Sequence, residues 1–209
     1  MTRFRFPALA AAMLASAAMV PSARAAVYGD VPACAAGSTT PALLVWLDGL
    51  KDRKGRIRVE LFPSNDKDFL EDDFVLQKAG KDFRRIEFAA PVAGPVAACI
   101  RAPRPGRYSF AMIHDRDGKH KFSFSSDGVG FPGNPKLGWS KPKSAKAAVT
   151  LGSGVTEMHV MMNYFHGLGF SPVRRCGSST SANSIPPPAA ASAPMSTARC
   201  SCLPKPATN

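Results

Sequence analysis

The chain has 209 residues, of which 45% are hydrophobic and 20% are charged, with 27 Lys and Arg against 15 Asp and Glu. An intrinsically disordered chain would contain fewer apolar residues, and a membrane channel would contain several long uncharged spans. The composition therefore indicates a basic, folded protein and excludes both of those classes.

The first 25 residues have the pattern of a secretory signal peptide. Arg3 and Arg5 give a positive start, an uncharged apolar run of 13 residues covers 8–20, and Ala23 to Ala25 has the small-x-small pattern of a cleavage site. The apolar run is short for a transmembrane helix, so we expect cleavage after Ala25 and a protein that lies in the periplasm or outside the cell without spanning the membrane. Cleavage removes three arginines and no acid, which lowers the formal net charge from +12 to +9.

The last segment, 174–209, is dominated by Ser, Ala and Pro and contains few large apolar side chains. Such a segment cannot bury enough surface to offset the entropy of ordering, so we expect a disordered tail. Between the signal peptide and the tail we expect an N-terminal segment over 26–40 and one β-sandwich domain over 41–173. A domain of that size can form its own hydrophobic core.

Period-two alternation of apolar and polar residues recurs through this domain. Ile57, Val59 and Leu61 alternate with polar residues, which is typical of a half-buried antiparallel strand. Runs of this kind, together with the continuous apolar run at 43–47, predict seven strands, near 43–47, 57–61, 86–88, 96–100, 108–112, 147–151 and 158–164. The segments 49–55 and 152–154 are interpreted as hairpin turns. The predicted fold class is an all-β, antiparallel sandwich of about seven strands.

Two segments depart from the strand pattern. In 66–78, Phe69, Leu70 and Phe74 are spaced closer to a helical period and acids crowd the first turns, which predicts a short helix in a crossover loop. The segment 118–144 contains five Gly and three Pro and shows no convincing strand. Because loops of this length in compact domains are usually functional or mobile, we expect any functional site there.

Five cysteines, at positions 34, 99, 176, 200 and 202, would enter an oxidising compartment. Disulfides can form there, and the odd number leaves at least one cysteine over. The preferred pair is Cys34 with Cys99, which would tether the N-terminal segment to the sandwich. The alternative is Cys34 with Cys176, which would join the two ends of the domain.

The segment from His114 to Gly118 places two carboxylates, Asp115 and Asp117, at a glycine turn, as at the start of a calcium loop. The twelfth position of such a loop would be Ser126, and Asp127 is adjacent but out of register. We therefore favour a charged turn whose Asp side chains bond backbone amides. A metal-binding protein or metal-dependent hydrolase that uses His114, Asp115 and Asp117 is the alternative. His114 continues an apolar strand face, which favours a buried, hydrogen-bonded histidine.

The long loop also carries a candidate ligand surface of aromatic and basic residues: Phe122, Phe124, Phe131, Trp139, Lys136 and Lys141. Aromatic faces flanked by cations suit sugar rings or acidic glycans, although rings that fold back to cap the sandwich are the competing interpretation. The positive charge predicts an envelope partner such as an anionic glycan, a lipid surface or a protein. No nucleic-acid-binding motif is present, so we do not expect a nucleic-acid partner, and we predict no cofactor.

Four short motifs, at 47–50, 55–62, 105–108 and 114–118, together resemble the domain of unknown function 2141 family of exported bacterial proteins. The resemblance covers Leu43 to Tyr164. It implies a transthyretin-like (prealbumin-like) β-sandwich in the periplasm or outside the cell, related in architecture to immunoglobulin domains, and it brings no enzymatic activity. Typical members follow His-Asp with several Asn or Asp residues, where this chain has Lys119, His120 and Lys121. The expected function is a non-catalytic binding or structural module of the cell envelope.

Overall fold

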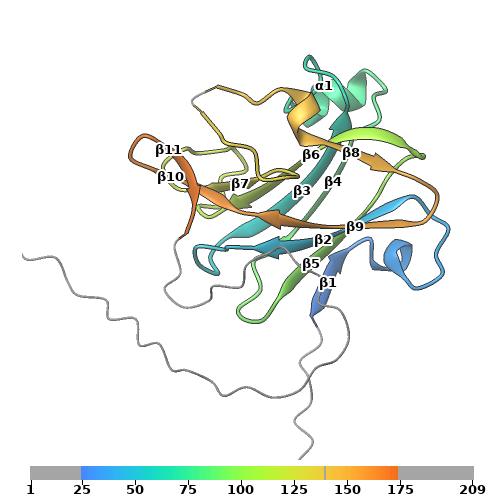
Figure 1. The fold of residues 1–209 in the computed structure, drawn as a ribbon, viewed down its shortest axis with the longest axis horizontal. Helices are drawn as coiled ribbons and strands as arrows, with labels where there is room; N and C mark the ends of the chain where they lie inside the picture. Colours follow the sequence, from blue (N-terminus) through green and yellow to red (C-terminus); the bar gives the residue numbers. More distant parts are fainter. Residues whose placement is uncertain (1–24, 139, 174–209) are drawn as a thin grey trace, which may run out of the picture. The chain divides into compact units, whose positions relative to one another are not determined.

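The computed structural model describes residues 25–138 and 140–173 (Figure 1). The predicted signal peptide up to residue 24 and the predicted tail lie outside these residues. The described part contains eleven strands in two sheets, one α-helix and two 3-10 helices. The predicted all-β sandwich with one short helix is confirmed. None of the helices described is both long and apolar enough to cross a lipid bilayer.

The smaller sheet has the strand order β1-β5-β2-β9. Its strands are β1 (Ala26–Gly29), β5 (Val96–Arg101), β2 (Ala42–Asp48) and β9 (Val155–Met161). β2 and β5 are antiparallel, but β1 is parallel to β5 and β9 is parallel to β2. The predicted antiparallel pairing therefore does not hold for two of the three pairs in this sheet. β2 and β9 are far apart in the sequence, with β5 and strands of the other sheet between them, so no hairpin joins this parallel pair.

The larger sheet has the order β11-β10-β7-β6-β3-β4, with β8 also paired to β6, and all of its pairs are antiparallel. Every predicted strand is present, although 158–164 is divided at Met162 between β9 and β10. β1, β7 and β11 are additional. The strands of this sheet are β3 (Arg56–Pro63), β4 (Arg84–Ala89), β6 (Gly106–Asp115), β7 (Gly128–Gly130), β8 (Ala148–Leu151), β10 (Asn163–His166) and β11 (Gly169–Pro172).

The two predicted hairpin turns instead connect the two sheets. The segment 49–55 joins β2 to β3, and 152–154 joins β8 to β9, and each pair of strands is divided between the sheets. The hairpin interpretation is wrong because glycine-containing turns have the same local chemistry whether the next strand pairs with the last one or crosses to the opposite layer.

The main core lies between the sheets. It contains the alternating residues of β3 (Ile57, Val59, Leu61) and of β6 (Tyr108, Phe110, Met112), together with apolar residues of β2, β5 and β9. β7 approaches this core closely at Gly128, where a Cβ atom would lie 2.4 Å from the Tyr164 ring. Only glycine fits there without displacing the tyrosine.

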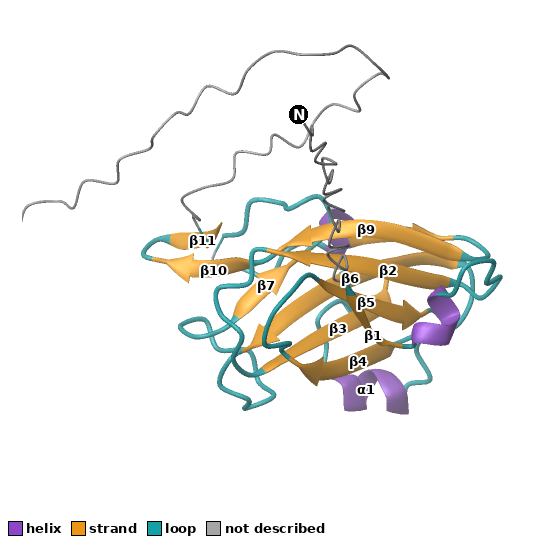
Figure 2. Ribbon diagram, turned by 90° about the horizontal axis from the view of Figure 1, so that it is seen from below, coloured by secondary structure: helices purple, strands orange, loops and turns teal. Residues whose placement is uncertain are grey.

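The outer face of the larger sheet is buried as well. Phe62, Ala111 and Ile113 point to this side and pack with Phe69 and Phe131. The cover comes from the segment that contains α1 (Asp73–Lys78) and from the long segment after β6; α1 lies beside β4 in Figure 2. The α1 helix confirms the predicted short helix, and the Asp72 side chain caps it by accepting from the Phe74 amide. β3 is therefore buried on both faces, and the prediction that it is half-buried is wrong.

The segment 26–40, which we expected to precede the sandwich domain, contains β1 and the 3-10 helix η1 (Val31–Cys34). β1 is a strand of the smaller sheet. Cys34 forms a disulfide with Cys99 of β5, which confirms the preferred pairing. The other 3-10 helix, η2 (Ser144–Ala147), leads into β8. The N-terminal segment is thus held both by strand pairing and by a covalent bond.

Candidate functional site

A cavity of about 580 Å³ lies over the outer face of the larger sheet. Its floor comes from β3, β4, β6 and β7, and its walls come from the turn before α1, from residues 120–124, 137–138 and 140–142, and from Phe170 of β11. The volume lies within the range of about 300–1,000 Å³ that is usual for small-molecule sites. The long loop, where we expected a site, forms one of its walls.

The floor carries buried charges. Arg58 and Glu60 of β3 are only 6% and 2% exposed. Arg85 of β4 donates from Nε to Glu60 at 2.6 Å and from Nη1 to Asp73 of α1 at 2.5 Å. A buried ion is costly unless it is paired, and the two guanidinium groups beside the Glu60 carboxylate provide that pairing.

The Arg58 guanidinium is only partly satisfied. Nη1 donates to the His120 carbonyl at 3.0 Å, and Nε lies 3.4 Å from Glu60 Oε1. Nε is buried and has no hydrogen-bond partner among the residues described. A guanidinium carries five N–H donors, and a buried unsatisfied donor costs about 1–3 kcal/mol. This arginine therefore holds unused hydrogen-bonding capacity at the floor of a cavity.

Burial raises the pKa of Glu60, while the positive charges of Arg85 and Arg58 act in the opposite direction. The raised pKa means that desolvation of the carboxylate outweighs the attraction of the two arginines.

Aromatic rings form the walls. Phe122 meets Phe124 edge-to-face at 5.3 Å, and Phe170 lies 6.2 Å from Phe122 and 5.7 Å from Phe124. Phe131 is buried and packs on Phe69 at 6.0 Å. Phe124 is 49% exposed, so the ring cluster opens to solvent there.

Most of the predicted ligand-surface residues are thus brought together. Phe122, Phe124, Phe131 and Lys141 all line the cavity, and Lys141 Nζ lies 6.0 Å from the Phe69 ring. Lys136 is exposed and does not belong to the lining. Trp139 lies outside the described residues. The rings cover the outer face of the larger sheet, and they leave a cavity beneath them.

The backbone at the cavity rim is strained at two positions. Leu70 and His120, both in the lining, have positive φ angles of 58° and 60°. Asp115 Oδ2 accepts from the His120 amide, and the His120 carbonyl accepts from Arg58, so the unusual conformation places a carbonyl on the arginine. Non-glycine residues in this region persist where the surroundings enforce them, and they concentrate at functional sites.

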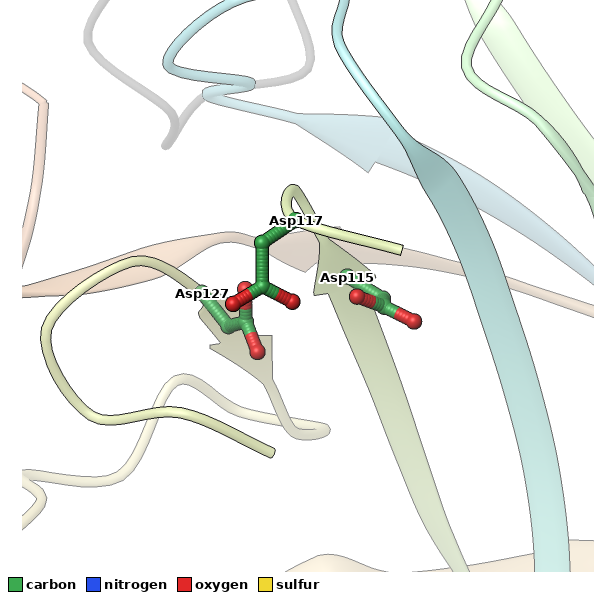
Figure 3. Close-up of side chains that lie close together, drawn as sticks. All are labelled: Asp115, Asp117 and Asp127. Atoms are coloured by element: carbon green, nitrogen blue, oxygen red, sulfur yellow. The ribbon is translucent and has the colours of Figure 1, made fainter. Parts of the chain in front are cut away.

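The second candidate site is the aspartate turn (Figure 3), where one carboxylate oxygen from each of Asp115, Asp117 and Asp127 lies within 4.8 Å of the others. The structure therefore adds Asp127, which the sequence placed out of register. His114 does not join this group, because successive side chains of a strand point to opposite faces. Its Nδ1 lies 2.7 Å from the Tyr164 hydroxyl, inside the sandwich.

The three carboxylates accept hydrogen bonds from the backbone of their own loop. The donating amides are those of Gly118 and His120 for Asp115, Arg116 and Ser123 for Asp127, and Lys119 for Asp117. Lys119 Nζ also lies 2.9 Å from Asp117 and supplies a positive charge to the cluster. These contacts are those of turn-forming aspartates, and they position His120 over Arg58.

His114 is fully buried in the sandwich. Its Nε2 lies 2.7 Å from the Lys54 carbonyl, which can only accept, so Nε2 carries the proton and Nδ1 accepts from the Tyr164 hydroxyl. Burial lowers the pKa of His114. The histidine is a neutral, hydrogen-bonded core residue, as its place on the apolar face of β6 indicated.

A family model described as "Uncharacterized protein conserved in bacteria (DUF2141)" matches residues 45–159, more than half of the chain. The chain belongs to this family. The resemblance found in the sequence motifs is confirmed. No curated protein and no solved structure matches the chain.

In this DUF2141 protein, sequence reasoning missed Arg58, Glu60, Arg85 and Phe170 as members of the site. Arg58 and Glu60 occupy the polar positions of an alternating strand, which normally face solvent. One signal points the other way: Phe62 continues their face of β3 with a large aromatic residue, which indicates that this face is covered.

Proposed function

We propose that this DUF2141 protein is an exported, non-catalytic binding module of the cell envelope whose ligand occupies the cavity over the larger sheet. The observation that carries this proposal is the cavity itself: it has the size of a ligand site, its walls are aromatic, and buried charges lie at its floor. Sites for small molecules combine largely apolar walls with a few polar groups that orient the ligand.

The arrangement of the charged groups suits binding rather than bond cleavage. At the floor, Glu60 contacts both Arg58 and Arg85, and Arg85 also contacts Asp73. Nucleophilic catalysis requires a nucleophile within hydrogen-bond reach of a base. His114 is engaged with Tyr164 and Lys54 on the opposite face of the sheet, so it is not directed at the cavity.

Export is supported by the disulfide between Cys34 and Cys99, since disulfides persist in oxidising compartments. The basic composition suits contact with anionic components of the envelope. The N-terminal sequence of protein recovered from the periplasm or medium tests this part, and we expect it to begin at Ala26. Recovery of uncleaved protein in the cytoplasm alone would contradict it.

Ligand binding in the cavity can be tested with the Gly138→Trp variant. Gly138 lines the cavity, no described atom beyond its chain neighbours lies within 4 Å of the position that a Cβ would take there, and its φ is not positive, so a large side chain can be placed at the cavity without backbone strain. Gly152→Trp is the matched control, because Gly152 has the same free space but lies in the β8–β9 connection.

We expect the wild-type chain and Gly152→Trp to bind the neutral apolar dye Nile red with increased fluorescence, and Gly138→Trp to lose that binding. Native mass spectrometry of protein purified from envelopes should show a co-purified small molecule with the same dependence. Equal dye binding by all three proteins would overturn the proposed site.

A further inference from the structure

We infer that the cavity selects an amphipathic monoanion, with one carboxylate that pairs with the Arg58 guanidinium and an apolar body that lies between the aromatic walls. This inference rests on the proposed function and names the chemical class of its ligand. It depends on three observations: the unused donors of Arg58, the composition of the walls, and the distribution of charge around the cavity.

The hydrogen-bonding state of Arg58 favours an acid group at the floor. Nη1 donates to the His120 carbonyl, Nε is enclosed beside Glu60, and Nη2 forms no hydrogen bond with the described residues, so the remaining Nη1 hydrogen and the two Nη2 hydrogens are the donors left for a ligand. The side chain is 8% exposed, so little water can replace the missing partners. A carboxylate matches a guanidinium because it accepts two parallel N–H bonds.

Arg58 and Arg85 differ in how completely they are paired. Arg85 donates to two carboxylates, those of Glu60 and Asp73, at 2.6 and 2.5 Å. Arg58 shares only Glu60, at 3.4 Å, in an ion pair without a hydrogen bond. An entering anion therefore gains more from Arg58 than from Arg85.

The walls provide a surface on which an apolar body can lie. Phe122, Phe124 and Phe170 present rings, and Leu137 and Val129 add aliphatic surface. The lining also contains charged side chains, among them Glu71, Asp72, Lys121 and Lys141, so a ligand with both an apolar body and a charged group matches it better than a purely apolar one.

The rim favours a single negative charge. Glu71 and Asp72 of the turn before α1 line the cavity on one side, and Lys121 and Lys141 line it as well. With two acids and two lysines the rim has no net charge, so it adds no attraction for a second negative charge on the ligand. The volume of about 580 Å³ accommodates one medium-length chain or a fused ring system, but not a two-chain lipid.

The test compares decanoate with 1-decanol, two probes of equal chain length that differ in charge. Both are titrated calorimetrically into the chain that begins at Ala26. We expect the wild-type protein to bind decanoate at least about tenfold more tightly than decanol, because a hydrogen bond to a charged group contributes about 1.5–3 kcal/mol, or roughly ten- to a hundredfold in affinity.

Two variants place this preference on Arg58. In Arg58→Met, decanoate binding should weaken by about ten- to a hundredfold, while decanol binding should stay within about twofold. Arg56→Met is the matched control: Arg56 lies on the same strand, pairs with Glu87 and does not line the cavity. It should bind both probes like the wild-type protein.

Loss of the fold is distinguished from loss of the contact by Arg58→Lys, which keeps the charge beside Glu60 but lacks the planar fork. This variant should keep decanol binding and the thermal midpoint while it loses most of the preference for decanoate. Decanol binding by Arg58→Met serves as the same check, because it requires an intact cavity.

The outcomes separate this inference from the proposed function. Equal affinity for decanoate and decanol, or a preference that survives in Arg58→Met, would overturn the acid contact and leave the cavity as a binding site. The acid contact would also be overturned if neither decanoate nor decanol bound, while Nile red bound and Gly138→Trp abolished that binding. Arg58-dependent binding to phosphatidylglycerol vesicles without decanoate binding would overturn the small-molecule ligand. If Gly138→Trp bound Nile red as well as the wild-type protein does, the proposed function itself would be overturned.

Discussion

Strand β3 has two buried faces of opposite character. Toward the smaller sheet, Ile57, Val59 and Leu61 are fully buried in a continuous apolar core. Toward the outside, Arg58 and Glu60 are also buried, but they lie beneath a cavity and form an incompletely satisfied ion pair. The inner face stabilises the fold by removing apolar surface from water. The outer face carries desolvated charges, which suits recognition better than stability.

The largest expected effect is on the inner face. Phe110→Ala should lower the free energy of unfolding by about 3–5 kcal/mol, because Phe110 is fully buried and its removal leaves a cavity. Phe122→Ala, on the outer face, should cost less than about 2 kcal/mol, because Phe122 is only half-buried. Urea denaturation followed by circular dichroism measures both. Equal losses would show that the two faces contribute equally to stability.

The second prediction concerns the buried charges. Glu60→Leu should lower the free energy of unfolding by about 3 kcal/mol, because it leaves Arg58 without its counter-ion in a buried position. The double variant Arg58→Met/Glu60→Leu should recover most of that loss, since Arg85 keeps Asp73. The same denaturation series measures the recovery. A double variant as unstable as Glu60→Leu would contradict the view that the ion pair does not stabilise the fold.

The third prediction concerns His114, a buried polar residue at the end of the inner face. Its pKa is lowered in the folded state, so between that value and the unfolded value of 6.5 the unfolded chain binds more protons. The stability should therefore fall as the pH drops below 6.5, with a slope of at most about 1.4 kcal/mol per pH unit from this group. Urea denaturation at several pH values checks this.

His114→Gln is the control for that experiment. The variant should be less stable at neutral pH but should lose the slope, because glutamine does not titrate. His120, His159 and His166 are exposed, so they provide reference histidines in the same chain. A slope that persists in His114→Gln and disappears in His120→Gln would assign the titration to the cavity rim instead.

The smallest expected effect is that of calcium. The carboxylates of Asp115 and Asp127 accept hydrogen bonds from backbone amides, and Lys119 pairs with Asp117. Because the three carboxylates already have these partners, millimolar calcium should leave the thermal midpoint unchanged. Differential scanning calorimetry with and without calcium measures it. An increase in the midpoint that Asp117→Asn abolishes would favour the metal-binding alternative.

The strands of this protein were predictable because their period-two pattern is local. The partners of the strands were not. The connection 49–55 has the composition of a hairpin turn, yet it carries the chain from β2 in one sheet to β3 in the other. β7 also escaped prediction, because Gly128–Gly130 contains two glycines and a single valine, and its glycines reflect contacts with Tyr164 and Val160.

The site was predictable only in part. The aromatic residues of the long loop marked one wall, since large apolar side chains in a polar loop must pack somewhere. The floor was hidden, because Arg58 and Glu60 are indistinguishable in sequence from solvent-facing residues until the segment that covers them is known. Phe170 comes from β11, a strand beyond the family match.

The single residue Met162 between β9 and β10 carries the chain from one sheet to the other just past the end of the family match. A recombinant fragment trimmed to 45–159 would lack β10 and β11 at one end and β1 at the other. It would expose the free edges of β7 and β5 and would remove Tyr164, the hydroxyl partner of the core histidine. Expression of the domain for crystallisation or screening should therefore extend from Ala26 to Val173.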